Sequence, residues 1–184
     1  MEENKVEVSV EDIRNCCNTI TSKILSQMRG GIVRHLDKKS IAEGPVLYRW
    51  WFPEDFVDAL IDKFKNLEKS DLERKEIKCD NKCYNYYALY FGKSKNGRKR
   101  FNQHTSKNID KSTLRRTLDA ICNDLTRIDI KDCYFEWVEV DNENLLECLE
   151  AMCIVSGKYP LNIEGNPCCQ DWIVEARNKN NKSK

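Results

Sequence analysis

The sequence has no uninterrupted apolar run of 18 residues, which excludes a membrane-spanning helix of ordinary length. It opens Met-Glu-Glu-Asn and lacks the basic segment and apolar core of a signal peptide, so we expect a cytoplasmic protein. It also lacks an internal repeat. The mean hydropathy is −0.69 and 40% of the 184 residues are hydrophobic. These values predict one soluble, folded domain with room for additions to its core structure.

The ten cysteines lack the pattern of a disulfide framework or of a zinc site. They are scattered, and no secretory segment accompanies them. Cys79 and Cys83 have the spacing of half a zinc site, which Cys168-Cys169 could complete, but the chain has no second CxxC and no histidine close to the first pair. A zinc-stabilised protein-interaction domain therefore stays as an alternative, against cysteines that act as small hydrophobic residues.

The net charge of only +1 favours no partner, but the charges are unevenly distributed. From Asp129 to Glu150 eight acids stand against Lys131 alone. The segment from Lys93 to Arg116 contains nine basic residues and one acid, Asp110. The basic residues are Lys93, Lys95, Arg98, Lys99, Arg100, Lys107, Lys111, Arg115 and Arg116. Such a basic segment is typical of a surface that binds a phosphate backbone, and also of a solvated helical face.

Hydrophobic periodicity predicts an α+β fold. A helix over residues 9–29 begins at a capping box of Ser9 and Asp12 and ends at Gly30-Gly31. Strands are predicted at 46–52, 84–91 and 133–140, and further helices at 54–68, 95–104, from Ser112 onward and at 142–156. The charged stretch 69–78 is predicted as a helical continuation or a linker, and 177–184 as a disordered tail.

Two positions are chemically conspicuous. Glu150 lies on a nearly all-apolar helix, four residues from Leu146 and from Ile154, where a carboxylate needs a cation, a metal ion or a hydrogen-bond donor. An ion pair with an arginine and a metal ligand explain it equally well. Arg100 and His104 share a face of the basic helix and offer a fixed cation for a phosphate and a proton-exchanging group.

With these residues in place, the sequence resembles the GIY-YIG nuclease family. Val46-Leu47-Tyr48 stands where the family has its first motif, without its glycine and isoleucine, and Tyr90-Phe91-Gly92 stands where it has the second. Arg100 follows Tyr90 at the distance of the family's arginine. Glu150 matches the metal-binding glutamate, and Asn162 matches the asparagine that follows a proline after the last helix.

The resemblance implies a small mixed three-stranded β-sheet flanked by helices. It covers a nuclease domain over residues 44–166, with a helical insertion at about 54–80 between the first two strands. Residues 1–43 form an accessory N-terminal helix and linker, and 167–184 form a C-terminal segment. Residues 1–43 and 54–80 are the expected places for target recognition or for a homodimer contact.

The resemblance also implies a DNA endonuclease that depends on Mg²⁺ or Mn²⁺ held by Glu150. A restriction-like enzyme fits slightly better than a repair or homing enzyme, and an inactive DNA-binding protein on a nuclease fold is the alternative. Tyr48 would orient or deprotonate water if cations such as Lys93 and Arg100 lower its pKa. The implied catalytic set is Tyr48, Tyr90, Lys93, Arg100, His104, Glu150 and Asn162, and the expected DNA contacts are Lys95, Arg98, Lys99, Lys107, Arg115 and Arg116.

Overall fold

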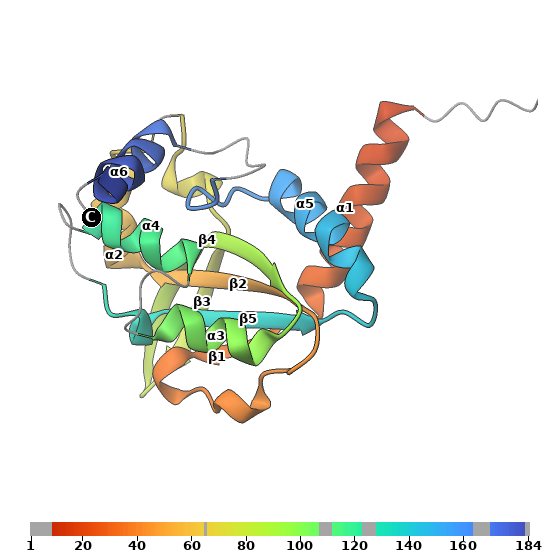
Figure 1. The fold of residues 1–184 in the computed structure, drawn as a ribbon, viewed down its shortest axis with the longest axis horizontal. Coiled ribbons are helices and arrows are strands. Elements are labelled where there is room, and N and C mark those ends of the chain that lie inside the picture. Colours follow the sequence, from red (N-terminus) through yellow and green to blue (C-terminus); the bar gives the residue numbers. More distant parts are fainter. Residues whose placement is uncertain (1–8, 65, 107–111, 123–127, 164–169, 183–184) are drawn as a thin grey trace, which may run out of the picture.

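The computed structural model describes residues 9–64, 66–106, 112–122, 128–163 and 170–182, and shows one antiparallel sheet with helices on both faces (Figure 1). The helices are α1 (Val10–Ser26), α2 (Glu54–Ile61), α3 (Gly97–Thr105), α4 (Thr113–Cys122), α5 (Leu146–Ser156) and α6 (Asp171–Lys182). The strands are β1 (Arg29–Ile32), β2 (Val46–Pro53), β3 (Arg74–Cys79), β4 (Lys82–Ser94) and β5 (Tyr134–Glu139). Within the described ranges, no helix combines the length and the apolar character needed to cross a membrane.

The sheet has five strands in the order β1-β5-β2-β4-β3, and every neighbouring pair is antiparallel. The prediction of a mixed, three-stranded sheet is therefore wrong in number and in direction. The three predicted strands are the central ones, β2, β4 and β5. The sequence missed the two edge strands, β1 and β3, because neither has the aromatic and β-branched composition that revealed the central strands.

The glycine pair after α1 forms part of strand β1 and does not simply end a helix. Helix α1 already ends at Ser26, with Gln27 as its C-cap, so its predicted end at residue 29 is wrong. Gly30 pairs with Glu136 of β5, and a Cβ atom there would lie 2.2 Å from the carbonyl oxygen of Phe135. Only a glycine permits this approach of the two strands, so the residue serves sheet pairing.

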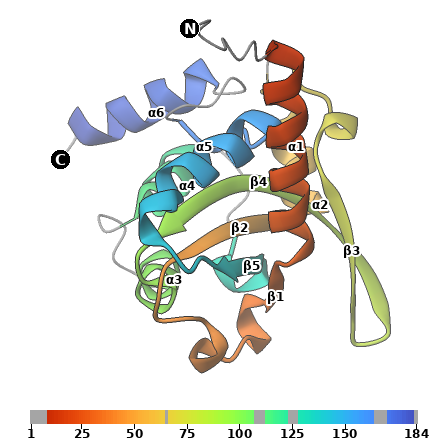
Figure 2. The same ribbon diagram turned by 90° about the vertical axis from the view of Figure 1, so that its right-hand side faces the viewer.

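The β3–β4 hairpin replaces the predicted helical continuation or linker at 69–78. Figure 2 shows this hairpin reaching outward beyond the other strands. Asp80 and Asn81 join its strands with φ angles of 49° and 61°, a left-handed conformation that Asp and Asn tolerate in two-residue hairpin turns. The prediction failed because the charges of β3 suit a solvent-facing edge strand as well as a helix.

The predicted helices exist, with altered bounds. Ser9 and Asp12 form the expected capping box of α1. Helix α2 ends at Ile61, seven residues before the predicted end, although Phe64 and Leu67 beyond it are still buried. Helix α6 extends to Lys182, so the prediction of disorder is wrong for residues 177–182, while 183–184 lie outside the described residues. Ile173 in its first half is fully buried.

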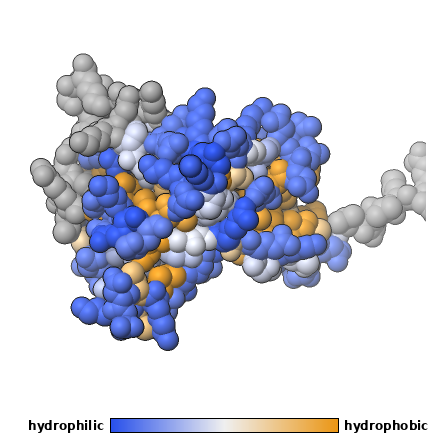
Figure 3. All heavy atoms as spheres, turned by 90° about the horizontal axis from the view of Figure 1, so that it is seen from below, coloured by the Kyte–Doolittle hydropathy of each residue, from blue (hydrophilic) through white to orange (hydrophobic). Residues whose placement is uncertain are grey.

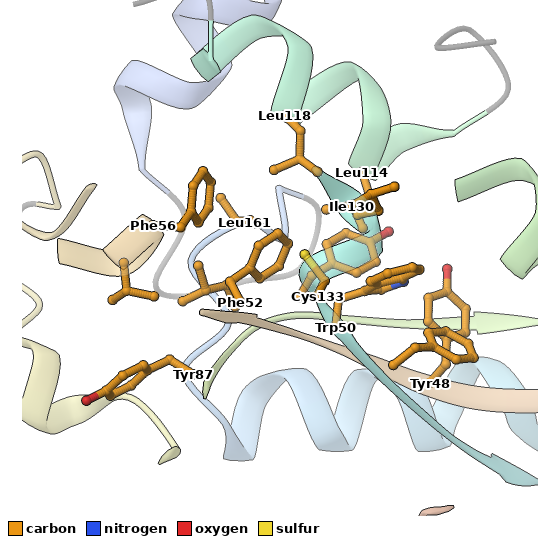
Figure 4. Close-up of a cluster of buried hydrophobic side chains, with 14 of the residues drawn as sticks. Tyr48, Trp50, Phe52, Phe56, Tyr87, Leu114, Leu118, Ile130, Cys133 and Leu161 are labelled. Carbon is orange, nitrogen blue, oxygen red and sulfur yellow. The ribbon is translucent and has the colours of Figure 1, made fainter. Parts of the chain in front are cut away.

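The two faces of the sheet carry separate hydrophobic clusters. Tyr48, Trp50 and Phe52 project from β2 toward the face covered by α2, α3, α4 and α6, and Figure 4 shows them with Leu114 and Leu118 of α4. The side chains that alternate with them pack against α5, which is in turn covered by α1. Because both faces are covered, β2 is a nearly continuous apolar run.

The face of the molecule shown in Figure 3 is mostly hydrophilic, with a few hydrophobic patches. Val10 and Ile13 of α1 and Val155 of α5 are among the exposed large apolar side chains.

Candidate active site

Tyr48 and Tyr90 face each other across neighbouring strands, with their ring centroids 6.3 Å apart. Tyr48 on β2 pairs with Gly92 on β4, and Tyr90 pairs with Trp50, so both rings lie on the same face of the sheet. A Cβ atom at Gly92 would lie 2.6 Å from the Tyr48 hydroxyl oxygen. The glycine of the second motif is therefore required for the Tyr48 ring to cross β4.

His104 joins this pair from α3. Its Nε2 atom lies 3.0 Å from Tyr48 Oη, and its Nδ1 atom lies 2.5 Å from Ser112 Oγ. The imidazole is fully buried, and its ring packs edge-on against Tyr48, Trp50 and Tyr90. Burial, together with the nearby charges of Arg100 and Arg115, lowers the pKa of His104 to about 3. The ring is therefore neutral at pH 7.

Arg100 lies close enough to Tyr48 and Tyr90 for its charge to affect the pKa of both. Burial raises the pKa of Tyr48 well above 10, Tyr90 adds to this shift, and Arg100 opposes it. Burial also raises the pKa of Tyr90, with Glu150 adding to the shift and with Arg100 and Arg177 opposing it. Both tyrosines are thus neutral phenols at pH 7, opposite to the lowered pKa that the resemblance required of Tyr48 as a base.

Glu150 on α5 is paired with Lys93 on β4. Lys93 Nζ lies 2.5 Å from Glu150 Oε2 and 2.5 Å from Glu147 Oε2. Burial lowers the pKa of Lys93, but its bonds to the two carboxylates outweigh this effect, so the pKa is raised overall. Of the two explanations for Glu150, an ion pair is therefore present, with a lysine as the partner. The Glu150 side chain keeps 20% of its surface exposed, so a further ligand can still reach it.

Asn162 continues the sheet at the outer edge of β4. Its Oδ1 accepts from Phe91 N at 2.8 Å, and its Nδ2 donates to Phe91 O at 2.7 Å. The backbone N–H of Leu161 donates to Leu89 O at 3.0 Å just before it. Strand β3 pairs with β4 only as far as Tyr87, so this segment takes over where β3 stops. Asn162 therefore holds the backbone that carries Tyr90.

Replacing Asn162 by Ala should lower the free energy of unfolding by about 2 to 4 kcal/mol. The change leaves the N–H and the C=O of Phe91 without their side-chain partners, and a buried unsatisfied group costs about 1–3 kcal/mol. Urea denaturation followed by circular dichroism measures the loss. Asn144→Ala, at an exposed position in the 3-10 turn before α5, is the control and should change stability by less than about 0.5 kcal/mol. Equal stabilities of the two variants would contradict the bracing role.

Five of the six predicted DNA contacts lie in the described residues, and they divide into three groups. Lys95 and Lys99 are exposed, just before and on α3. Arg98 instead donates to the carbonyl oxygens of Lys39 and Ile41 and pairs with Glu43, so it fastens the preceding loop. Arg115 and Arg116 on α4 are partly buried, and their Nε atoms have no hydrogen-bond partner among the described residues. Lys107 lies outside the described residues.

The described part of the chain contains no preformed zinc site. No group of three or more His, Cys, Asp or Glu side chains there is placed to hold a metal ion. Cys83 pairs with Lys78 and Cys79 pairs with Lys82 across the hairpin. Directly opposite residues share a face and successive residues alternate, so the two cysteines point to opposite faces. They cannot form half of one site. Cys168-Cys169 lie outside the described residues.

Two residues near the tyrosines are not assigned to the site by the sequence. The sequence indicates Ser112 only as the cap of α4, and its hydrogen bond to His104 depends on the return of the chain after α3. Arg177 of α6 falls in the segment predicted as a disordered tail, yet it lies close enough to Tyr90 to affect its pKa. The sequence signal for Arg177 is the apolar pattern of Trp172, Ile173 and Val174 before it, which indicates a packed helix.

Comparison with protein families matches residues 46–132 to the model of the GIY-YIG catalytic domain. The match begins at β2, which carries Tyr48, and includes Tyr90, Arg100 and His104. Just under half of the chain is therefore similar to the GIY-YIG catalytic domain, in agreement with the resemblance drawn from the sequence. Neither the curated proteins nor the solved structures give a significant match to it. Glu150 and Asn162 lie beyond the matched residues, so their assignment depends on the arrangement described above.

Proposed function

We propose that this protein is a divalent-metal-dependent DNA endonuclease. The observation that carries the proposal is that Arg100 and Glu150 both lie close enough to Tyr48 and Tyr90 to affect the pKa of the two tyrosines. The four residues come from α3, α5, β2 and β4. Hydrolysis of a phosphodiester needs a cation at the phosphoryl oxygens, a metal ligand and groups that position water, and this set contains one of each.

Glu150 suits Mg²⁺ or Mn²⁺ better than a softer metal. Mg²⁺ prefers oxygen ligands and is commonly held by one or two carboxylates, several waters and the substrate phosphate. Glu150 offers one partly exposed carboxylate, and because its Oε2 is bonded to Lys93, a metal ion would share the carboxylate with that ammonium or displace it. A metal ion bound there would polarise the scissile phosphate and stabilise the departing 3′ oxygen.

The chain's own residues would divide the remaining tasks. Arg100 would neutralise charge that develops on the phosphoryl oxygens. Tyr48 and Tyr90, as neutral phenols, can orient the attacking water by hydrogen bonds. Lys93 would hold the Glu150 side chain in place through their ion pair. Lys95, Lys99, Arg115 and Arg116 would contact the DNA backbone and contribute affinity without sequence specificity. We also propose that the segments added to the domain, residues 1–43 and 54–80, provide DNA specificity or a dimer contact. A restriction-like role stays a proposal as well.

The test is the nicking of supercoiled plasmid DNA with Mg²⁺ or Mn²⁺ against a chelator control. Wild type should nick only with the metal, and Arg100→Ala should reduce the rate by about 10²- to 10³-fold, the usual effect of removing one group that stabilises transition-state charge. Asn102→Ala, at an exposed position on the same helix, should leave the rate within about twofold. If wild type binds DNA but never cleaves it with either metal, the alternative of an inactive DNA-binding protein replaces the proposal.

A further inference from the structure

A continuous line of buried polar groups runs from the start of α4 to Tyr48. Ser112 is 1% exposed, His104 is fully buried, and Tyr48 is 2% exposed. The serine hydroxyl meets the imidazole at 2.5 Å, and the imidazole meets the phenol at 3.0 Å. An imidazole between two hydroxyls can carry its proton on either nitrogen. The position of that proton decides whether His104 donates to Tyr48 or accepts from it.

The hydrogen bonds of Ser112 settle the choice. A serine hydroxyl has one proton to donate and two lone pairs to accept with. One lone pair of Ser112 Oγ accepts the backbone N–H of Arg115 at 3.1 Å, as the cap of α4. Across the part of the chain that the structure describes, His104 Nδ1 is the acceptor that remains for the hydroxyl proton. If Nδ1 carried a proton instead, the buried hydroxyl would lose this acceptor, at a cost typical of an unsatisfied group.

Protonation of both nitrogens would also remove the acceptor at Nδ1, but the surroundings of His104 oppose it. Arg100 on the same helix and Arg115 on α4 bring positive charge toward the ring, and the aromatic rings of Tyr48, Trp50 and Tyr90 enclose it. A neutral ring whose Nδ1 accepts a hydrogen bond must carry its proton on Nε2.

We propose that Ser112 is a positioning residue that fixes the Nε2-protonated tautomer of His104 and thereby makes Tyr48 Oη the acceptor of the His104 hydrogen bond. The phenol proton of Tyr48 is then free to point toward Tyr90, whose ring centroid lies 6.3 Å from that of Tyr48. The chain of donors runs from Ser112 through His104 to Tyr48, and His104 acts as a donor that orients Tyr48 and does not take its proton. This catalytic consequence rests on the proposed nuclease function, whereas the tautomer itself does not.

The tautomer can be read directly by a long-range ¹H–¹⁵N correlation spectrum of protein labelled at histidine. The chain has two histidines, His35 and His104, so His35→Gln assigns both rings. We expect His104 at pH 7 to show a protonated Nε2 and an unprotonated Nδ1. An Nδ1-protonated ring in the wild type would overturn the inference, and so would an imidazolium.

Two substitutions test whether Ser112 is the cause. Ser112→Ala removes the donor to Nδ1 and should give a mixture of tautomers or the Nδ1-protonated form, whereas Ser112→Thr retains a hydroxyl and should restore the wild-type spectrum. An unchanged Nε2-protonated ring in Ser112→Ala would overturn the role of Ser112. Urea denaturation would report the lost cap separately, since a cap affects stability and does not select a tautomer.

Nicking rates give the second readout. Ser112→Ala should nick about tenfold or more slowly, as expected when a partner that orients a site residue is removed, and Ser112→Thr should recover most of the rate. Nicking by Ser112→Ala at the wild-type rate would overturn the positioning role. If the wild type shows the expected tautomer but cleaves no DNA, the nuclease proposal fails and the tautomer assignment stands. If it cleaves DNA while His104 is protonated on Nδ1, the tautomer assignment fails and the nuclease proposal stands.

Discussion

Glu150→Gln should reduce metal-dependent nicking by about 10³-fold or more and leave the protein folded and able to bind DNA. The amide has the size of the carboxylate but lacks the charge that a hard divalent cation requires. Metal stabilisation of transition-state charge contributes several kcal/mol, and each 1.36 kcal/mol corresponds to about a tenfold change in rate. Lys93 keeps Glu147 as a partner, so the fold around the site retains an ion pair.

Glu147→Gln is the matched control for this substitution. Glu147 Oε2 lies at the same 2.5 Å distance from Lys93 Nζ, but its side chain is 82% exposed, whereas that of Glu150 is 20% exposed. Its substitution should leave the nicking rate within about twofold. Single-turnover plasmid nicking measures the rates, and fluorescence anisotropy with labelled DNA in chelator measures binding. If Glu150→Gln nicks as fast as Glu147→Gln, Glu150 is not the metal ligand.

The second large effect is an acid-dependent loss of stability caused by His104. In the unfolded chain its pKa is near 6.5, but in the folded protein it is about 3, because of burial and of the Arg100 and Arg115 charges. Between these pH values the unfolded state binds a proton that the folded state rejects, so the free energy of unfolding falls as the pH falls from 6.5 toward 3. At about 1.36 kcal/mol for each pH unit, the full contribution is on the order of 5 kcal/mol. It is fully present above pH 6.5.

Urea denaturation at pH 7 and at pH 4.5 measures this contribution by comparison of wild type with His104→Gln. The wild type should lose about 2 to 3 kcal/mol more than the variant over this interval, because the carboxylates that also titrate there are common to both proteins. His35→Gln, which retains His104, should follow the wild type. Parallel losses in wild type and in His104→Gln would show that His104 is not held neutral by the fold.

Local sequence patterns determine much of this protein. The capping box at Ser9, the aromatic strands around Tyr48, Tyr90 and Trp137, and the helix that carries Arg100 and His104 follow from residue type and spacing over a few positions. The match to the GIY-YIG catalytic domain agrees with the resemblance drawn from the same residues. Such features depend on neighbours in sequence, which is why they can be predicted.

The edge strands and the partners of the charged residues were decided by tertiary structure. Glu150 is the acid that stands out in the sequence, but among the residues that the structure describes the most buried acid is Glu136 of β5, which is 1% exposed and bonds to Arg49 and to Trp51. Because strand β5 is covered on both faces, the alternation of apolar and polar residues along it does not reveal that Glu136 is buried. The Lys93 partner of Glu150 lies 57 residues away in sequence.

The site itself shows the same division. The sequence by itself determined which residue types are present and which helix or strand carries Tyr48, Tyr90, Arg100, His104 and Glu150, because secondary structure follows local periodicity. Only the tertiary structure decided that Ser112 meets His104 and that burial raises the pKa of both tyrosines. Hydrogen-bond partners and desolvation depend on segments that are distant in the chain, so local pattern does not contain them.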